Sequence, residues 1–149
     1  MNLKQKLYQY CEVFIEKRFL TIKRTIEDFQ KSLQSETKSS AGDKHETGRA
    51  MLQLEREKAG QQLAEINKIK LVLSKINLGK KSNTVTPGSL VYTNHSNYFI
   101  AISAGELMLD NESFYAISAS TPIGKLLIGK TVGDYFSFNG NSIEIKKIE

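Results

Sequence analysis

Two carboxylates near the middle of the chain are the residues best placed to do chemistry. Asp43 and Glu46 lie three residues apart in the segment SSAGDKHETGRAM, residues 39–51, between two long stretches with helical patterns. One interpretation is structural, because an N-cap Asp followed by Glu at the third helical position is a common helix start. The other is that this turn is a tip that presents both carboxylates to a partner. His45 lies between them, and without a second His or Cys nearby it is predicted to be a solvated residue rather than a metal ligand.

The two stretches on either side of this turn have the pattern of paired helices. Residues 2–38 contain neither Pro nor Gly, and apolar residues recur there every three or four positions. This first seam consists of Cys11, Ile15, Phe19, Ile22, Ile26, Phe29 and Leu33, and the second of Ala59, Leu63, Ile66, Ile69, Leu73 and Ile76. Helices joined by a short turn pack antiparallel. Residues 1–78 are therefore predicted to form an antiparallel coiled-coil hairpin with its tip at about residues 39–46.

The second half of the chain has the composition of a small β domain. Residues 79–88 are rich in Gly, Ser, Thr and Pro and are predicted to be a linker. Residues 89–149 contain five β-branched and aromatic runs: SLVYT, YFIAIS, FYAIS, DYFSF and SIEIKKI. The connections DNES and NGN predict hairpins. Thr121 before Pro122 predicts a short helix that Gly129 closes. These features indicate about five strands around one short helix, an α+β domain.

Composition restricts the class of protein. A chain of 149 residues fits one ordinary domain or two small ones, and 40% hydrophobic with 25% charged residues is typical of a soluble globular protein. No apolar run approaches the roughly 18 residues that a membrane span requires. The N-terminus lacks the apolar core of a signal peptide, so a cytoplasmic location is expected. The single cysteine, Cys11, cannot support an internal disulfide and is predicted to be a core residue.

Charge is distributed unevenly between the two halves. Residues 1–83 carry 17 Lys and Arg against 10 Asp and Glu, whereas residues 84–149 carry 4 against 6. A basic half joined to a mildly acidic half suggests an anionic partner for the first. The alternative is that these lysines only solvate a long exposed helix pair.

Two motifs make the chain resemble the Gre family of bacterial transcript elongation and cleavage factors. The first, GDKHE at residues 42–46, is similar to the family's tip pattern Gly-Asp-x-x-Glu. The second, STPIGKLLIGKTVGD at residues 120–134, is close to the family's Ser-Pro-(Leu/Ile)-Gly motif and the Gly-Lys-x-x-Gly-Asp that follows it. The resemblance implies an N-terminal antiparallel coiled coil and a C-terminal domain with an FKBP-like fold.

The resemblance also implies a mechanism and a set of partners. Gre factors insert the coiled coil into the secondary channel of RNA polymerase, where the tip carboxylates help to hold Mg²⁺ and the polymerase cleaves the backtracked nascent RNA 3′ end. Asp43 and Glu46 would be the working residues, holding a Mg²⁺ that they share with polymerase and that the free protein does not bind. Lys44 and Arg49 would contact RNA or polymerase. The chain would be no enzyme itself and would have no small-molecule substrate.

The sequence departs from the family directly after the tip motif, which leaves alternatives open. Where cleavage factors commonly continue Glu-Asn-Ala-Glu-Tyr, Glu46 is followed by Thr47, Gly48, Arg49 and Ala50. A relative that enters the same channel and regulates polymerase without cleavage is the closest alternative. A prolyl isomerase, by analogy with other FKBP-like proteins, would need an aromatic-lined pocket. A coiled-coil adaptor would need only a capped turn.

Overall fold

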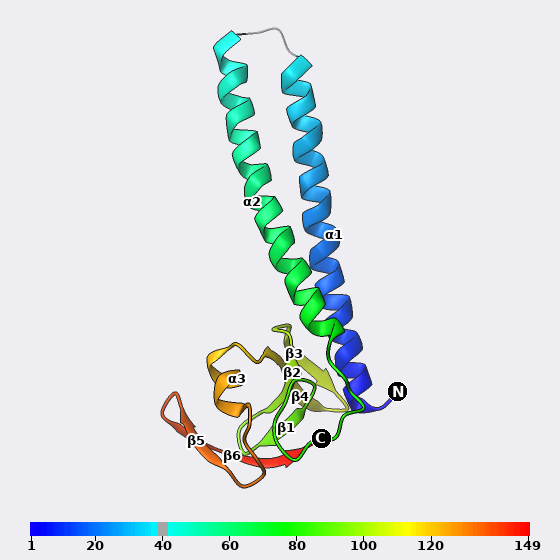
Figure 1. Cartoon of the computed structure of the whole chain (residues 1–149), viewed down its shortest axis with the longest axis vertical. Helices are drawn as coiled ribbons and strands as arrows, with labels where there is room; N and C mark the ends of the chain where they lie inside the picture. The colour runs from blue at the N-terminus through cyan, green and yellow to red at the C-terminus, as the bar shows by residue number, and fades with distance from the viewer. Residues whose placement is uncertain (39–41) are drawn as a thin grey trace. The chain divides into compact units, whose positions relative to one another are not determined.

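A computed structural model describes the backbone of residues 1–38 and 42–149, and the side chains of residues 1–35 and 47–149. Two long helices come first and are followed by strands, with one short helix between β4 and β5 (Figure 1). The chain divides into two compact units, Ile15–Lys70 and a second that joins Met1–Phe14 to Leu71–Glu149. This arrangement confirms the predicted fold class, a helical hairpin followed by a small α+β domain.

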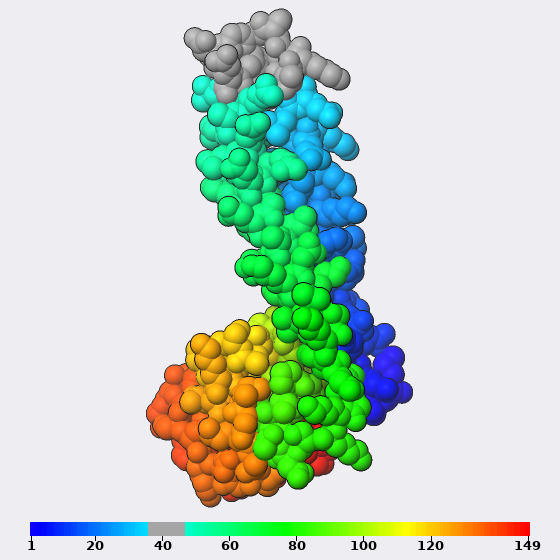
Figure 2. Space-filling model, in the orientation of Figure 1, coloured from blue at the N-terminus to red at the C-terminus, as the bar shows by residue number. Residues whose placement is uncertain are grey.

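The unit Ile15–Lys70 consists of the greater part of helices α1 (Leu3–Lys38) and α2 (Gly42–Ser74). The two helices lie side by side in the space-filling view, α1 in blue and α2 in green (Figure 2). Their predicted seams face inward, since Ile15, Ile22, Ala59 and Ile66 are all less than 9% exposed. Apolar residues spaced three and four positions apart lie on one face of a helix. When these faces of two helices pack together, their apolar side chains are buried from water.

The other unit is built on a six-stranded sheet with the order β3-β4-β2-β1-β6-β5. The strands are β1 (Leu90–Thr93), β2 (Asn97–Ala101), β3 (Gly105–Leu109), β4 (Glu112–Ser118), β5 (Tyr135–Phe138) and β6 (Asn141–Ile148). Neighbours are antiparallel except β2 and β4, which are parallel. β3 and β5 are therefore the two edge strands.

Both faces of this sheet are covered by apolar packing. On one face Val91, Ile100 and Ile145 form a core cluster with Ile123 and Leu127 of helix α3 (Pro122–Leu127). Phe99 and Phe114 are also no more than 1% exposed, and strand alternation places them on the opposite face. Burying large side chains on both faces is the main apolar stabilisation of a domain this small.

The structure has six strands where the sequence pattern predicts five. The additional strand is β3, whose residues Leu107, Met108 and Leu109 are three consecutive residues with no β-branching and no polar alternation. Both predicted hairpins are confirmed. β3 turns into β4 through Asp110 and Asn111, at φ 52° and 64°, and β5 turns into β6 through residues 139–140, at φ 51° and 79°. Positive φ at both central positions defines the type I′ turn, whose twist suits paired strands.

Two contacts connect the second unit. The start of α1 packs with the strand domain, since the Tyr10 hydroxyl donates to the Ala104 carbonyl at 3.2 Å, and the compact units accordingly divide within the helices. In addition, the segment predicted as a linker contributes Val85, which is fully buried, and its N–H donates to the Lys130 carbonyl at 2.9 Å. An apolar side chain and a satisfied N–H make residue 85 part of the core.

Candidate functional site: the helical hairpin

The predicted tip lies largely outside the residues whose side chains the structure describes. This holds for Asp43, Lys44 and Glu46, although α2 begins at Gly42 and so includes all three in its helical backbone. Arg49 lies within the described part and is exposed on α2. The catalytic and metal-binding roles of Asp43 and Glu46 therefore stay predictions.

A cross-helix contact holds the hairpin at the other end of the unit. The Lys70 Nζ on α2 lies 3.0 Å from Oε2 of Glu16 on α1, and 3.9 Å from the centre of the Phe19 ring. The ammonium group therefore has a carboxylate and an aromatic face as partners at once. Ion pairs within one helix, such as Lys68 with Glu65 at 3.6 Å, do not connect the two helices. The Lys70 contact, by comparison, joins α1 to α2.

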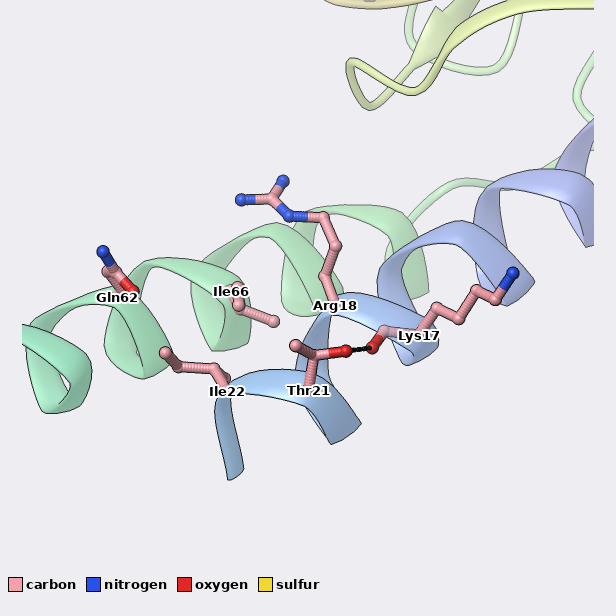
Figure 3. Close-up of a pocket in the computed structure, with 6 residues that line it drawn as sticks. All are labelled: Lys17, Arg18, Thr21, Ile22, Gln62 and Ile66. Carbon is pink, nitrogen blue, oxygen red and sulfur yellow. Dashed lines mark hydrogen bonds between the residues drawn. The ribbon is translucent and has the colours of Figure 1, made fainter. Parts of the chain in front are cut away.

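A shallow groove of about 560 Å³ runs along the hairpin. Its floor is made by Ile22 and Ile66 from facing helices, and Lys17 and Arg18 extend from α1 in different directions beside it (Figure 3). Thr21 also lines the groove, but its hydroxyl donates to the Lys17 carbonyl at 2.9 Å and so is already used within α1. A narrow apolar floor with cations at its rim can hold an anionic surface group in shallow contact.

Three cations form a line along the exposed side of α1. Lys17, Arg24 and Lys31 are all exposed and are separated by seven residues each. Seven residues fall within about 20° of two full helical turns, so these positions share one face, about 10 Å apart along the axis. The seam residues Ile15 and Ile22 lie on the opposite face. We call Lys17, Arg24 and Lys31 the outer stripe.

The outer stripe can also be found in the sequence, from the seven-residue spacing of its cations. The apolar seam repeats every seven residues on the inner face of α1. A residue two positions after a seam residue therefore repeats with the same period on the outer face. Lys38 continues the spacing in the sequence, although its side chain lies outside the described residues. Over residues 15–35 and 47–70 the hairpin carries ten Lys and Arg against six Asp and Glu. The described part of this unit therefore carries an excess of about four positive charges.

Within the described residues, no group of three or more His, Cys, Asp or Glu side chains is placed to bind a metal ion. The described helices also include none with the length and hydrophobicity needed to cross a membrane. Cys11 is fully buried, and burial raises the pKa of its thiol to about 12. A thiol with this pKa stays protonated near neutral pH and does not act as a nucleophile.

Comparisons with known proteins give a likeness among solved structures alone. No protein-family model matches the chain, and no curated protein gives a significant match. Among solved structures the chain is similar to one described as the structure of the transcription factor Gfh1. The two share 20% sequence identity over 89% of this chain and 87% of that chain, with a TM-score of 0.34. An identity and a TM-score this low carry no conclusion about what this chain binds or does.

Proposed function

We propose that this protein is a Gre-type factor that inserts its helical hairpin into the secondary channel of bacterial RNA polymerase and stimulates cleavage of backtracked transcripts. The observation that carries the proposal is the placement of the two motifs on the fold. GDKHE falls where α1 gives way to α2, and STPIGKLLIGKTVGD covers α3 and the turns after it. Motif order, motif placement and architecture agree with one another.

The second motif can be explained residue by residue in structural terms. Thr121 caps α3 by accepting from the Gly124 N–H at 3.1 Å, and Pro122 occupies the first turn, where no N–H is needed. A Cβ at Gly124 would lie 2.3 Å from the Ser118 carbonyl oxygen, so only glycine fits. Asp134 accepts from the backbone N–H of Thr131 at 2.7 Å. This motif therefore supports the fold, and the proposed activity depends on the first motif.

Under this proposal Asp43 and Glu46 are the working carboxylates. Mg²⁺ prefers hard oxygen ligands and usually takes one or two protein carboxylates, so these two residues suit an ion whose other ligands come from polymerase and RNA. Such an ion supplies an activated water for phosphodiester hydrolysis. The hairpin orients the carboxylates, and polymerase, not this protein, is the nuclease.

The cations of the hairpin would hold it in an anionic channel. Lys44 and Arg49 are proposed to contact the RNA 3′ end or polymerase close to the tip, and the outer stripe would meet negative charge farther along α1. Contacts between exposed cations and phosphate or carboxylate groups are strongly weakened by salt. Binding that falls steeply with ionic strength is therefore expected.

A second function has one specific observation in its favour. Arg49 and Ala50 are exposed on α2 at positions where cleavage factors commonly carry an acidic and an aromatic residue. A protein with this surface could occupy the same channel and regulate initiation or elongation without cleavage. Cleavage and occupancy must therefore be measured separately.

The test is transcript cleavage in a stalled, backtracked elongation complex made with the host's polymerase. We compare the intact protein with Asp43→Asn/Glu46→Gln and with a matched control, Glu55→Gln/Glu57→Gln, which removes two exposed carboxylates farther along α2. Polymerase binding of all three is measured in parallel. We expect faster cleavage with the intact protein and the control, and loss of stimulation with unchanged binding in the tip variant.

Other results select between the remaining functions. Binding with unchanged or slower cleavage would identify a regulator that occupies the channel. Equal loss of cleavage in the tip variant and the matched control would show a general charge effect instead of a role for Asp43 and Glu46. Absence of binding would overturn both polymerase functions.

A further inference from the structure

The hairpin of β3 and β4 is an acidic, exposed edge of the sheet that the proposed polymerase function does not use. β3 is the terminal strand, and in the described part of the chain it pairs with β4 alone. On an edge strand every second residue directs its N–H and C=O away from the sheet, so these groups are available to another strand. Apart from the ladder with β4, no backbone hydrogen bond joins residues 105–109 to another described element.

The side chains of this edge are apolar and poorly covered. Met108 is 61% exposed, and Tyr115, on the same face of the neighbouring strand, is 36% exposed. The Tyr115 ring lies 6.2 Å from that of Tyr98 on β2, so the patch continues inward over three strands. Natural proteins usually protect such an edge with Lys or Pro, and β3 contains neither.

The charge of this region has one sign. Residues 82–124 contain no Lys or Arg, whereas Glu106, Asp110 and Glu112 all lie on the hairpin of β3 and β4. Glu106 accepts a hydrogen bond from the Ser113 hydroxyl across the strand pair, which keeps its carboxylate on the exposed face. The other edge strand, β5, has no charged residue within its four positions. Only the β3 edge therefore combines free backbone groups, apolar side chains and negative charge.

We propose that the free edge of β3 binds an extended, basic segment of a partner protein as an additional strand. Backbone hydrogen bonds would give affinity, and alternate side chains would give specificity. Glu106 and Met108 lie on one face of β3, and Leu107 and Leu109 lie on the other. Lys or Arg of the segment would therefore lie beside Glu106, and its alternate, apolar residues would lie beside Leu107 and Leu109. A nucleic acid is disfavoured because its phosphates would face three carboxylates. A second copy is disfavoured because pairing β3 with β3 would bring the same carboxylates together.

The test uses the full chain labelled with ¹⁵N and a blocked peptide in which Lys and Val alternate, long enough to pair with all five residues of β3. One control peptide has a central Val replaced by Pro, which cannot complete the ladder. Another has Glu in place of Lys. Amide chemical shifts and amide exchange are followed during titration at low salt. We expect saturable shifts and slower exchange that centre on residues 105–109, with β5 unchanged, and no such response to either control peptide.

Two protein variants test the contribution of charge. Glu106→Gln should weaken binding of the peptide by up to roughly five-fold, the effect of losing one exposed ion pair. The matched control Glu144→Gln removes the same charge on β6 and should leave affinity unchanged. The amide spectrum of each variant reports whether the fold is intact.

Several outcomes would overturn the proposal. Equal binding of the Pro peptide would show attraction without strand addition, and shifts centred elsewhere would show a different surface. The absence of saturable binding at millimolar peptide would also contradict it. If the free chain self-associates and protects the β3 amides, the occupant is a second copy and not a basic partner. None of these outcomes depends on polymerase. The result of this test is therefore independent of whether the proposed function is correct.

Discussion

The Nζ atom of Lys70 lies 3.0 Å from Oε2 of Glu16, so an ion pair joins α2 to α1. The same ammonium lies over the Phe19 ring. Because the pair is partly exposed, its two contacts together should contribute about 1 kcal/mol. We expect Lys70→Gln to lower the free energy of unfolding of the hairpin by that amount, measured by urea denaturation followed by circular dichroism.

A control separates this contact from the general effect of removing a lysine. Lys68→Gln breaks an ion pair within α2 whose side chains are 75% and 69% exposed. It should change stability by less than about 0.5 kcal/mol. If the two variants are equally destabilised, the contact between the helices contributes no more to stability than an ion pair within one helix.

Two glycines should respond to alanine in opposite directions. A Cβ at Gly124 would lie 2.3 Å from a backbone carbonyl oxygen, so Gly124→Ala forces backbone movement and should destabilise the sheet unit by about 2 kcal/mol or more. Gly60 is inside α2, and apart from the neighbouring backbone of α2 itself nothing lies within 4 Å of the position that an alanine methyl would take, so Gly60→Ala should stabilise the hairpin by up to about 1 kcal/mol. Thermal unfolding of both variants measures the difference. Destabilisation by Gly60→Ala would contradict the open packing at that position.

Cys11 should make stability depend on pH in alkaline solution. Burial raises the pKa of its thiol from 9.0 to about 12, so the unfolded chain loses this proton first as pH rises. The contribution to stability is therefore complete below pH 9 and is lost between pH 9 and 12. At pH 10 the loss should be about 1 kcal/mol relative to pH 8. Tyr92, whose pKa is also raised to about 12 by burial, adds to the loss only above its ordinary value of 10.0.

Removing the thiol tests this assignment. Denaturation of the wild type and of Cys11→Ala at pH 8 and 10 should show a smaller pH effect in the variant, even though the variant is less stable at both. Labelling with a thiol reagent at pH 8 should occur only as fast as the protein opens. Rapid labelling of the folded protein would contradict the burial of Cys11.

The outer stripe predicts how binding responds to salt. Arg24→Gln/Lys31→Gln should weaken polymerase binding and reduce the slope of log affinity against log salt by about 2, if each cation meets one anionic group. Lys58→Gln/Lys68→Gln removes the same charge from α2, where both lysines already pair with glutamates in their own helix. The control should change the slope less, and an equal effect would indicate nonspecific charge attraction.

Much of the fold is predictable because its signals are local. The seam that contains Ile15 and Ile22 follows from helical spacing alone. The capped start of α3 at Thr121 and the turn at Asp110 depend on residues close together in sequence. Such features need no knowledge of distant partners, which is why residue order is sufficient to predict them.

The features that sequence did not predict depend on tertiary contacts. β3 has weak strand propensity and exists because β4 pairs with it, and Val85 is buried because a distant turn supplies a hydrogen-bond partner. The outer stripe consists of exposed polar residues. A pattern of apolar residues, which predicts buried positions, therefore does not reveal it. The tip carboxylates Asp43 and Glu46 were identified by motif, and their chemistry would be completed by groups that belong to another molecule.

The hydrogen bond from the Tyr10 hydroxyl to the Ala104 carbonyl spans 94 residues of sequence. During synthesis the N-terminal turns of α1 leave the ribosome long before the strands they pack against exist. The two helices of the unit Ile15–Lys70 can pack together as soon as α2 leaves the ribosome, since the contacts of that unit lie within these residues. Leu7 and Cys11, both almost fully buried in the finished protein, belong to the unit that also contains the strands. The start of α1 is thus translated long before the residues it packs against, and a nascent chain arrested before residue 104 would leave this part of α1 without that contact.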